Sequence, residues 1–146
     1  MRVFEFTIPL WPPTELRPNT AKPGPHWTTR AWLGHLASLK AEYGQAVYIY
    51  ALGTVQRAEW EAPEKVRLII TFLSPATRRP DDTNLLAAFK CGLDACVRAG
   101  ALRDDSPACV VETIVRHGPG LQNNYKGQAV KVRIEEMTNY GTRSKG

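Results

Sequence analysis

The chain has 146 residues, a length that suits one domain whose folding removes roughly 70% of the unfolded surface from water. With 43% hydrophobic and 23% charged residues it has the composition of a soluble globular protein, and its charged N-terminal segment without a long apolar stretch argues against a secretory signal and a membrane span. The net charge of +5 favours an anionic partner, but only slightly.

The first predicted element is a strand over residues 2 to 8, where polar and apolar side chains alternate. Residues 9 to 25 contain six prolines and must be irregular, because proline cannot donate a backbone hydrogen bond. A loop of this length in a compact domain is often a binding element. Arg17 and Lys22 could then contact phosphate groups. The competing interpretation is a surface loop that proline stiffens.

A helix is predicted from Thr28 or Thr29 to about Leu52, with Gly53 ending it. Its apolar stripe consists of Trp32, Leu36, Leu39, Tyr43, Val47 and Tyr50. The aromatic residues here offer a surface on which nucleic-acid bases could stack. Their spacing is that of core residues, and we favour the core.

Residues 65 to 73 form the clearest predicted strand. Apolar side chains fall on both of its faces, which is typical of a central strand covered above and below. The strand leads to Arg78 and Arg79. These arginines could bind phosphates through charge-assisted hydrogen bonds, or serve as counter-ions to the aspartates that follow.

A second helix follows Pro80, because Leu86, Phe89, Leu93 and the pair Cys96/Val97 recur on one helical face, and Gly100 ends it. We expect Asp82, Thr83 or Asn84 to cap it, with Asp81 entering from a loop or a strand end. Four turns of helix span on the order of 24 Å. The carboxylates at its two ends can therefore meet only if the chain after Gly100 folds back.

All five aspartates lie between positions 81 and 105, and all nine glutamates lie outside. Turns and helix caps favour Asp, and so do magnesium sites, where a short side chain holds the oxygens rigidly. Within residues 78 to 105 five basic residues balance the five aspartates, so the positive excess comes from the rest of the chain. An acidic centre in a basic surround suits an enzyme that holds both a cation and a polyanion.

The remaining elements are strands over residues 108 to 116 and about 128 to 136, followed by a flexible tail over residues 138 to 146. This order favours an α+β fold with a mixed sheet of about four strands and two main helices, in a single domain over residues 1 to 137. Three cysteines without a Cys-x-x-Cys pair indicate reduced thiols packed as apolar groups. A zinc site that combines them with His117 is the disfavoured alternative.

One set of residues carries a resemblance to a known family. It comprises Arg78-Arg79-Pro80-Asp81-x-x-Asn84-Leu85, then Lys90 and Asp94 in the helix, then Ala99-Gly100-Ala101-Leu102-Arg103-Asp104-Asp105-Ser106. This combination resembles the core motif of the RusA family of Holliday-junction resolvases. The similarity covers about residues 3 to 136.

The resemblance implies a small RusA-like homodimer that cuts four-way DNA junctions with Mg²⁺, or with Mn²⁺ as a substitute, in the cytoplasm of a bacterial cell. The gene belongs either to the cell itself or to a phage or prophage. It implies that Asp81 and Asp105 bind the metal, with Asp104 and Thr83 as further ligands. Asp81, Asp105, Asp104 and Lys90 would form the catalytic set, in which Lys90 stabilises charge on the phosphate in the transition state. The residues expected at the DNA are Arg78, Arg79, Arg17 and Lys22.

The sequence departs from the family pattern, Asp-x-Asp-Asn-Leu, at Thr83, which stands where the family has its second aspartate. Three outcomes are open. Thr83 is a tolerated weak ligand, or Asp82 replaces the missing carboxylate, or the site is crippled and the protein only binds branched DNA. We favour the first. A further interpretation, a basic α+β interaction module without a nucleic-acid partner, predicts little effect of salt on partner affinity.

Overall fold

A computed structural model describes residues 1–18, 20, 24–76, 79–121 and 125–137. The strands are β1 (Val3–Ile8), β2 (Val66–Leu73), β3 (Val110–Gly118) and β4 (Ala129–Glu136). The helices are α1 (Thr29–Ala58), α2 (Asp82–Ala88) and α3 (Lys90–Arg98), with short 3₁₀ turns η1 (Thr14–Leu16) and η2 (Tyr125–Gly127). The expected tail, residues 138 to 146, lies outside the described residues.

The four strands form one mixed sheet in the order β1-β4-β2-β3. β4 runs antiparallel to both β1 and β2, whereas β2 and β3 are parallel. The predicted α+β fold with a mixed four-stranded sheet is confirmed. None of the described helices combines the length and the apolar character that a membrane crossing requires.

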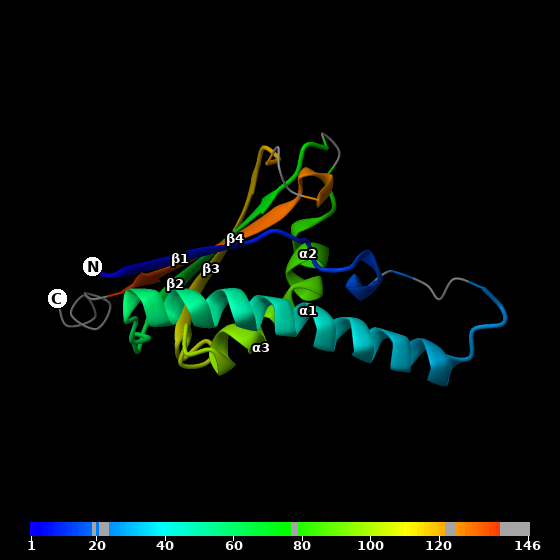
Figure 1. The fold of residues 1–146 in the computed structure, drawn as a ribbon, viewed down its shortest axis with the longest axis horizontal. Coiled ribbons are helices and arrows are strands. Elements are labelled where there is room, and N and C mark those ends of the chain that lie inside the picture. Colours follow the sequence, from blue (N-terminus) through cyan, green and yellow to red (C-terminus); the bar gives the residue numbers. More distant parts are fainter. Residues whose placement is uncertain (19, 21–23, 77–78, 122–124, 138–146) are drawn as a thin grey trace.

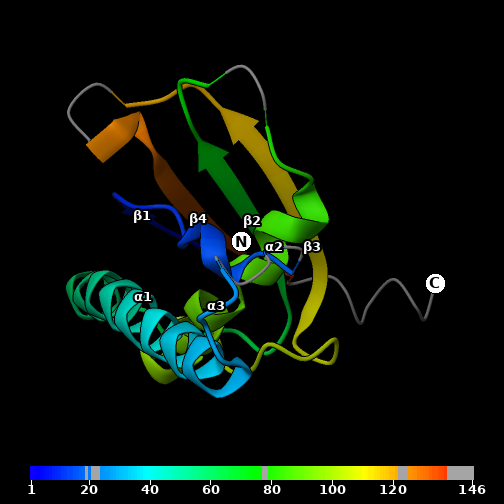
Figure 2. The same cartoon turned by 90° about the vertical axis from the view of Figure 1, so that its right-hand side faces the viewer.

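The helices lie together against one face of the sheet, with α1 and α3 side by side (Figures 1 and 2). Buried side chains of the strands meet those of α1 and α3 in the core, because alternate strand residues point to that face. The alternation predicted for the first strand is confirmed, since Phe4, Phe6 and Ile8 are buried and the residues between them are exposed.

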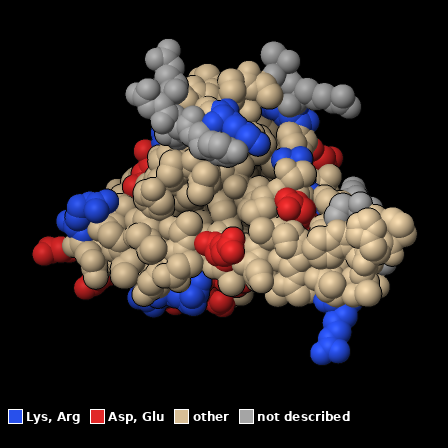
Figure 3. Space-filling view, turned by 45° about the vertical axis from the view of Figure 1, so that its right-hand side comes forward, with Lys and Arg blue, Asp and Glu red and all other residues tan. Residues whose placement is uncertain are grey.

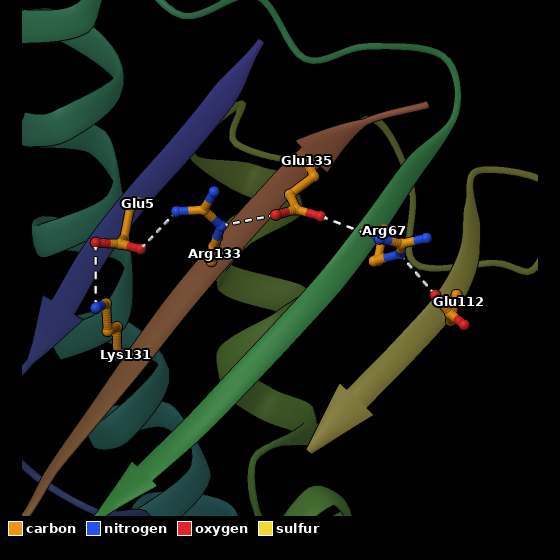
Figure 4. A network of polar contacts seen from close by, with 6 residues as sticks. All are labelled: Glu5, Arg67, Glu112, Lys131, Arg133 and Glu135. Atoms are coloured by element: carbon orange, nitrogen blue, oxygen red, sulfur yellow. Dashed lines mark hydrogen bonds and ion pairs between the residues drawn. The ribbon is translucent and has the colours of Figure 1, made fainter. Parts of the chain in front are cut away.

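The other face of the sheet is polar, contrary to the expectation that β2 is covered above and below. Six charged side chains form a chain of contacts across all four strands (Figure 4). The closest pairs are Arg67 Nε with Glu112 Oε1, at 2.6 Å but not aligned for a hydrogen bond, and Arg133 Nε with Glu135 Oε2 at 2.8 Å. The remaining links join Lys131 to Glu5, Glu5 to Arg133, and Glu135 to Arg67. Ile69 is nevertheless buried on this side, which is why the sequence pattern was ambiguous.

Helix α1 continues beyond the predicted end at Leu52 and Gly53. It begins as expected, with the Thr28 hydroxyl accepting a hydrogen bond from Ala31 N, and it ends where Glu59 adopts a left-handed conformation with φ 50°. A glycine in a helix costs only about 1 kcal/mol. Packing of Leu52 and Val55 against the core outweighs that cost. In the predicted stripe, Tyr50 proves exposed.

The second predicted helix is divided into α2 and α3 at Phe89, whose backbone has φ −85° and ψ −2°. The Phe89 ring is fully buried and packs edge-on against Phe72 of β2 and Tyr43 of α1. Gly92 makes room for this ring, because a Cβ atom there would lie 2.8 Å from Phe89 Cε1. Burial of one aromatic side chain thus sets the angle between α2 and α3.

Candidate active site

The chain does fold back after α3. Gly100 has φ +84°, and both Ala101 N and Leu102 N donate to Cys96 O, at 2.9 and 3.3 Å. Two further bonds fasten the returning segment, from Trp60 Nε1 to Ala101 O at 3.0 Å and from Arg103 Nε to Ala62 O at 2.9 Å. The aspartates that follow are thereby carried back along α3 to its first residue.

That first residue, Lys90, stands at the centre of the site. Its Nζ donates a hydrogen bond to Asp94 Oδ1 at 2.8 Å and another to Asp105 Oδ2. The bond to Asp105, followed by the bond to Asp94, raises the pKa of Lys90. The bond from Lys90 in turn lowers the pKa of Asp105. Asp105 is therefore ionised at neutral pH and held in place, with 29% of its side chain exposed.

An open cavity of about 500 Å³ lies in front of this ion pair. Its polar lining comes from Thr83, Lys90 and Asp105, and its apolar lining from Leu86, Ala87 and Leu93. The structure thus brings Thr83, from the start of α2, to the same cavity as Asp105. A second cavity, of about 310 Å³, contains Lys90 and Asp94 in its lining together with Leu16 and Pro18 beside η1.

Asp81 proves to be the residue that caps α2, in place of the expected Asp82, Thr83 or Asn84. Its Oδ1 accepts a hydrogen bond from Thr83 N at 2.7 Å. Asp104 also bonds locally, since its Oδ1 accepts from Asp105 N at 2.9 Å. Both side chains belong to exposed residues. Each cap or turn bond fixes the carboxylate relative to the backbone that carries Thr83 or Asp105.

Asp82 makes a pair that the sequence did not suggest. Its Oδ1 lies 2.5 Å from His117 Nε2, and the His117 side chain is 15% exposed and packs beside Phe72. The parallel register of β2 and β3 places His117 opposite Phe72. No sequence signal reveals this pair, because it depends on that register. The disfavoured zinc alternative gains no support, since no three His or Cys side chains of the described residues gather as a metal site. Burial raises the pKa of the Cys96 thiol to about 12.

Of the four residues expected at the DNA, the structure describes Arg17 and Arg79. Arg79 is exposed just before α2, and Arg17 is half-buried in the loop after η1. Arg78 and Lys22 lie outside the described residues. One face of the molecule carries acidic groups near its middle with basic groups above and below them (Figure 3).

The cavity offers oxygen atoms, which are the ligand atoms that Mg²⁺ prefers. Among the described residues no three His, Cys, Asp or Glu side chains gather as a ready metal cluster. Magnesium does not require one, because it keeps several waters and binds through one or two carboxylates plus the phosphates of a substrate. Asp105 supplies a carboxylate and Thr83 a hydroxyl oxygen at the cavity, and Asp81 caps the turn that carries Thr83.

No protein-family model and no curated protein matches this chain. The likeness to the RusA family is therefore one of motif residues. Of these, Lys90, Asp94 and Asp105 come together in space, and Thr83 lines one cavity with Lys90 and Asp105.

Proposed function

We propose that this protein is a Mg²⁺-dependent, structure-specific endodeoxyribonuclease that resolves Holliday junctions by paired phosphodiester hydrolysis in DNA recombination and repair. One observation carries the proposal: Lys90, Asp105 and Thr83 line one open cavity, with Asp105 ionised. A cation and two oxygen donors at a solvent-accessible cavity are suited to phosphoryl chemistry, in which the enzyme mainly positions groups and neutralises charge.

Each residue has a defined task in this proposal. Asp105 and Asp81 would hold the metal, with Thr83 and Asp104 as weaker or supporting ligands. A bound Mg²⁺, or Mn²⁺ in its place, supplies an activated water for in-line attack and neutralises phosphate oxygens. Lys90 stabilises negative charge on the phosphate in the transition state. Arg79 positions the DNA backbone, and Arg78 is assigned the same task from the sequence.

The choice of substrate rests on the motif resemblance and on charge. Branched DNA is a polyanion, and the chain carries a net charge of +5. Contacts to phosphates contain little sequence information, so selectivity would be mainly for shape. The proposal includes a homodimer, because two sites are needed to cut opposing strands of a junction, and a cytoplasmic location in a bacterial cell that carries the gene itself or within a prophage.

A second candidate, a branched-DNA binder with little or no catalytic activity, is favoured by one specific contact. Lys90 already neutralises Asp105, and the neutral Thr83 adds no charge to attract a metal ion. In this alternative the Lys90–Asp105 ion pair has a structural role and attaches the returning chain to α3.

A cleavage assay separates the two candidates. A labelled synthetic four-way junction and a linear duplex of matched sequence would be incubated with the protein in Mg²⁺ or in EDTA. The proposal predicts paired incisions of the junction that require Mg²⁺. Junction binding without incision would support the branched-DNA binder. Equal binding and incision of junction and duplex would contradict selectivity for branched shape.

A further inference from the structure

A separate cavity of about 250 Å³ is lined in part by Thr14 and Glu15 of η1, whereas Leu16 of η1 lines the cavity that contains Lys90. Its charged and amide groups come from two segments far apart in the sequence: Arg17 and Glu15 from the proline-rich loop, and Lys126 and Gln128 around η2. The remaining lining residues are Leu10, Trp11, Pro12, Pro13 and Thr14. Two cations, an amide and one carboxylate therefore line one small cavity.

The segment before Arg17 is attached to the domain at Leu10 and Trp11. Trp11 Nε1 donates to Leu73 O at 2.9 Å and to Ala129 O at 3.0 Å, which ties the loop to the ends of β2 and β4. The Tyr43 hydroxyl donates to Leu10 O at 2.8 Å. The Leu10 and Trp11 wall of the cavity is thus attached to the sheet and to α1.

Arg17 has a buried hydrogen-bond donor without an acceptor in the described part of the chain. Its Nε is buried, and no acceptor among the described residues bonds to it. Burial lowers the pKa of Arg17, but a guanidinium remains charged at neutral pH. An unsatisfied buried donor is rare in proteins because it costs about 1–3 kcal/mol, and more when it is charged. The terminal nitrogens of the guanidinium carry its remaining N–H donors, which are the ones left for a ligand.

The opposing segment has an uncommon backbone. Lys126 has φ 55°, a left-handed conformation that few residues other than glycine adopt, and Gly127 follows with φ +69°. The turn is held by Leu121 N, which donates to Gly127 O at 2.9 Å. This conformation fixes the backbone from which Lys126 reaches the cavity.

The one carboxylate in the lining, Glu15, does not cancel the positive charge. Its Oε2 lies 3.5 Å from His35 Nε2. The described lining residues carry two positive charges, on Arg17 and Lys126, and one negative charge, on Glu15. A guanidinium, an ammonium and an amide are the donors that bind phosphate oxygens in proteins.

We propose that Arg17, Lys126 and Gln128 form a second, preformed site for one phosphate group, supplied by a nucleic-acid backbone that also reaches the Lys90 cavity. The path is short. Arg17 lines this site, whereas its neighbours Leu16 and Pro18 line the cavity that contains Lys90 and Asp94. Adjacent Cα atoms are about 3.8 Å apart. A nucleic-acid strand that crosses η1 can therefore contact both cavities. The inference rests on the proposed function in its choice of nucleic acid as the source of the phosphate.

The test measures binding of a fluorescent oligo-dT and of a four-way junction in EDTA, where no cleavage occurs. Arg17→Gln should weaken both affinities about tenfold, the loss expected for one charge-assisted contact. The slope of log affinity for oligo-dT against log salt should also fall by about 0.7. Lys126→Gln should act in the same direction. Arg30→Gln removes an equal charge from an exposed position at the start of α1 and should change affinity far less.

A second measurement follows the Arg17 Nε–Hε signal by NMR in the native protein, during titration with the oligonucleotide or with inorganic phosphate. A shift with the oligonucleotide supports the site. A shift with inorganic phosphate alone, while Arg17→Gln and Arg30→Gln bind DNA equally, would overturn the nucleic-acid source, and no shift with either would overturn the site. Junction cleavage with normal binding by Arg17→Gln would sink this inference and leave the proposed function intact. A native protein that neither binds nor cuts DNA would refute the proposed function itself.

Discussion

Lys90 and Asp105, fifteen residues apart in the sequence, form an ion pair at the mouth of an open cavity. The pair links the first residue of α3 to the chain that returns after it. Because Lys90 also bonds Asp94 Oδ1, one ammonium group holds two carboxylates. This relationship underlies the proposed chemistry and the first prediction.

Lys90→Met should raise the pKa of Asp105 toward its ordinary value, because the hydrogen bond from Lys90 is the main cause of the lowering. A lowered pKa stabilises the fold above the unfolded-state pKa of Asp, and this stabilisation disappears as pH falls through the folded-state pKa. The raised pKa of Lys90 acts oppositely, so its contribution is lost as pH rises through that folded-state pKa. NMR titration of the Asp105 carboxyl carbon measures the shift. An unchanged pKa in the variant would contradict the pairing.

The same substitution should reduce the free energy of unfolding at pH 7 by no more than about 1 kcal/mol, since the pair is solvent-exposed. The stability difference between native protein and variant should shrink as pH falls below the unfolded-state pKa of Asp and through the lowered folded-state pKa of Asp105. Urea unfolding at pH 7 and at a series of lower pH values provides the comparison. A stability difference that does not shrink with falling pH would assign it to lost side-chain packing.

Thr83→Asp should increase Mg²⁺-dependent cleavage by about tenfold, the scale on which changes at a metal site act. The reason is charge, because a carboxylate attracts Mg²⁺ where a hydroxyl does not. Thr83→Asn is the matched control, since it offers a neutral oxygen and should leave activity low. Equal rates for the two variants would show that residue 83 does not bind the metal.

The Asp82–His117 pair should couple α2 to β3. Asp82→Asn and His117→Gln should each lower stability, and the double variant should lose less than the sum, with a coupling energy of about 0.5–1 kcal/mol. Chemical denaturation of the native protein, both single variants and the double variant gives this energy. Strict additivity would mean that the contact contributes nothing to folding.

Two helical glycines should respond oppositely to alanine. Gly92→Ala should destabilise the protein by about 1–3 kcal/mol, because the new Cβ would lie 2.8 Å from the buried Phe89 ring. Gly34→Ala should stabilise it by about 0.5–1 kcal/mol, because no atom beyond its chain neighbours and the adjacent helix backbone lies within 4 Å of its Cβ position and alanine favours helix. Thermal unfolding of Gly92→Ala and Gly34→Ala tests these two expectations. A neutral Gly92→Ala would show that α2 and α3 do not depend on the close approach of Phe89.

The sequence predicted the strands well because their side chains alternate, as Phe4, Phe6 and Ile8 do in β1. It missed the break at Phe89 and the end of α1 at Glu59, because both depend on packing between distant elements. At the site, the motif identified Lys90 and Asp105, but their contact requires the chain reversal at Gly100. His117 was missed because its pairing follows from the register of β2 and β3.

The most direct test of the proposed active site is the Mg²⁺-dependent incision rate of a labelled four-way junction by the native protein, by Asp81→Asn and by Glu42→Gln. Glu42 is exposed on α1 and serves as the matched carboxylate control. We predict paired incisions by the native protein and by Glu42→Gln, none in EDTA, and a loss of at least about a hundredfold in Asp81→Asn, the upper end of losses on removing a metal-site group. Equal incision by Asp81→Asn, or incision that persists in EDTA, would contradict the metal-dependent mechanism.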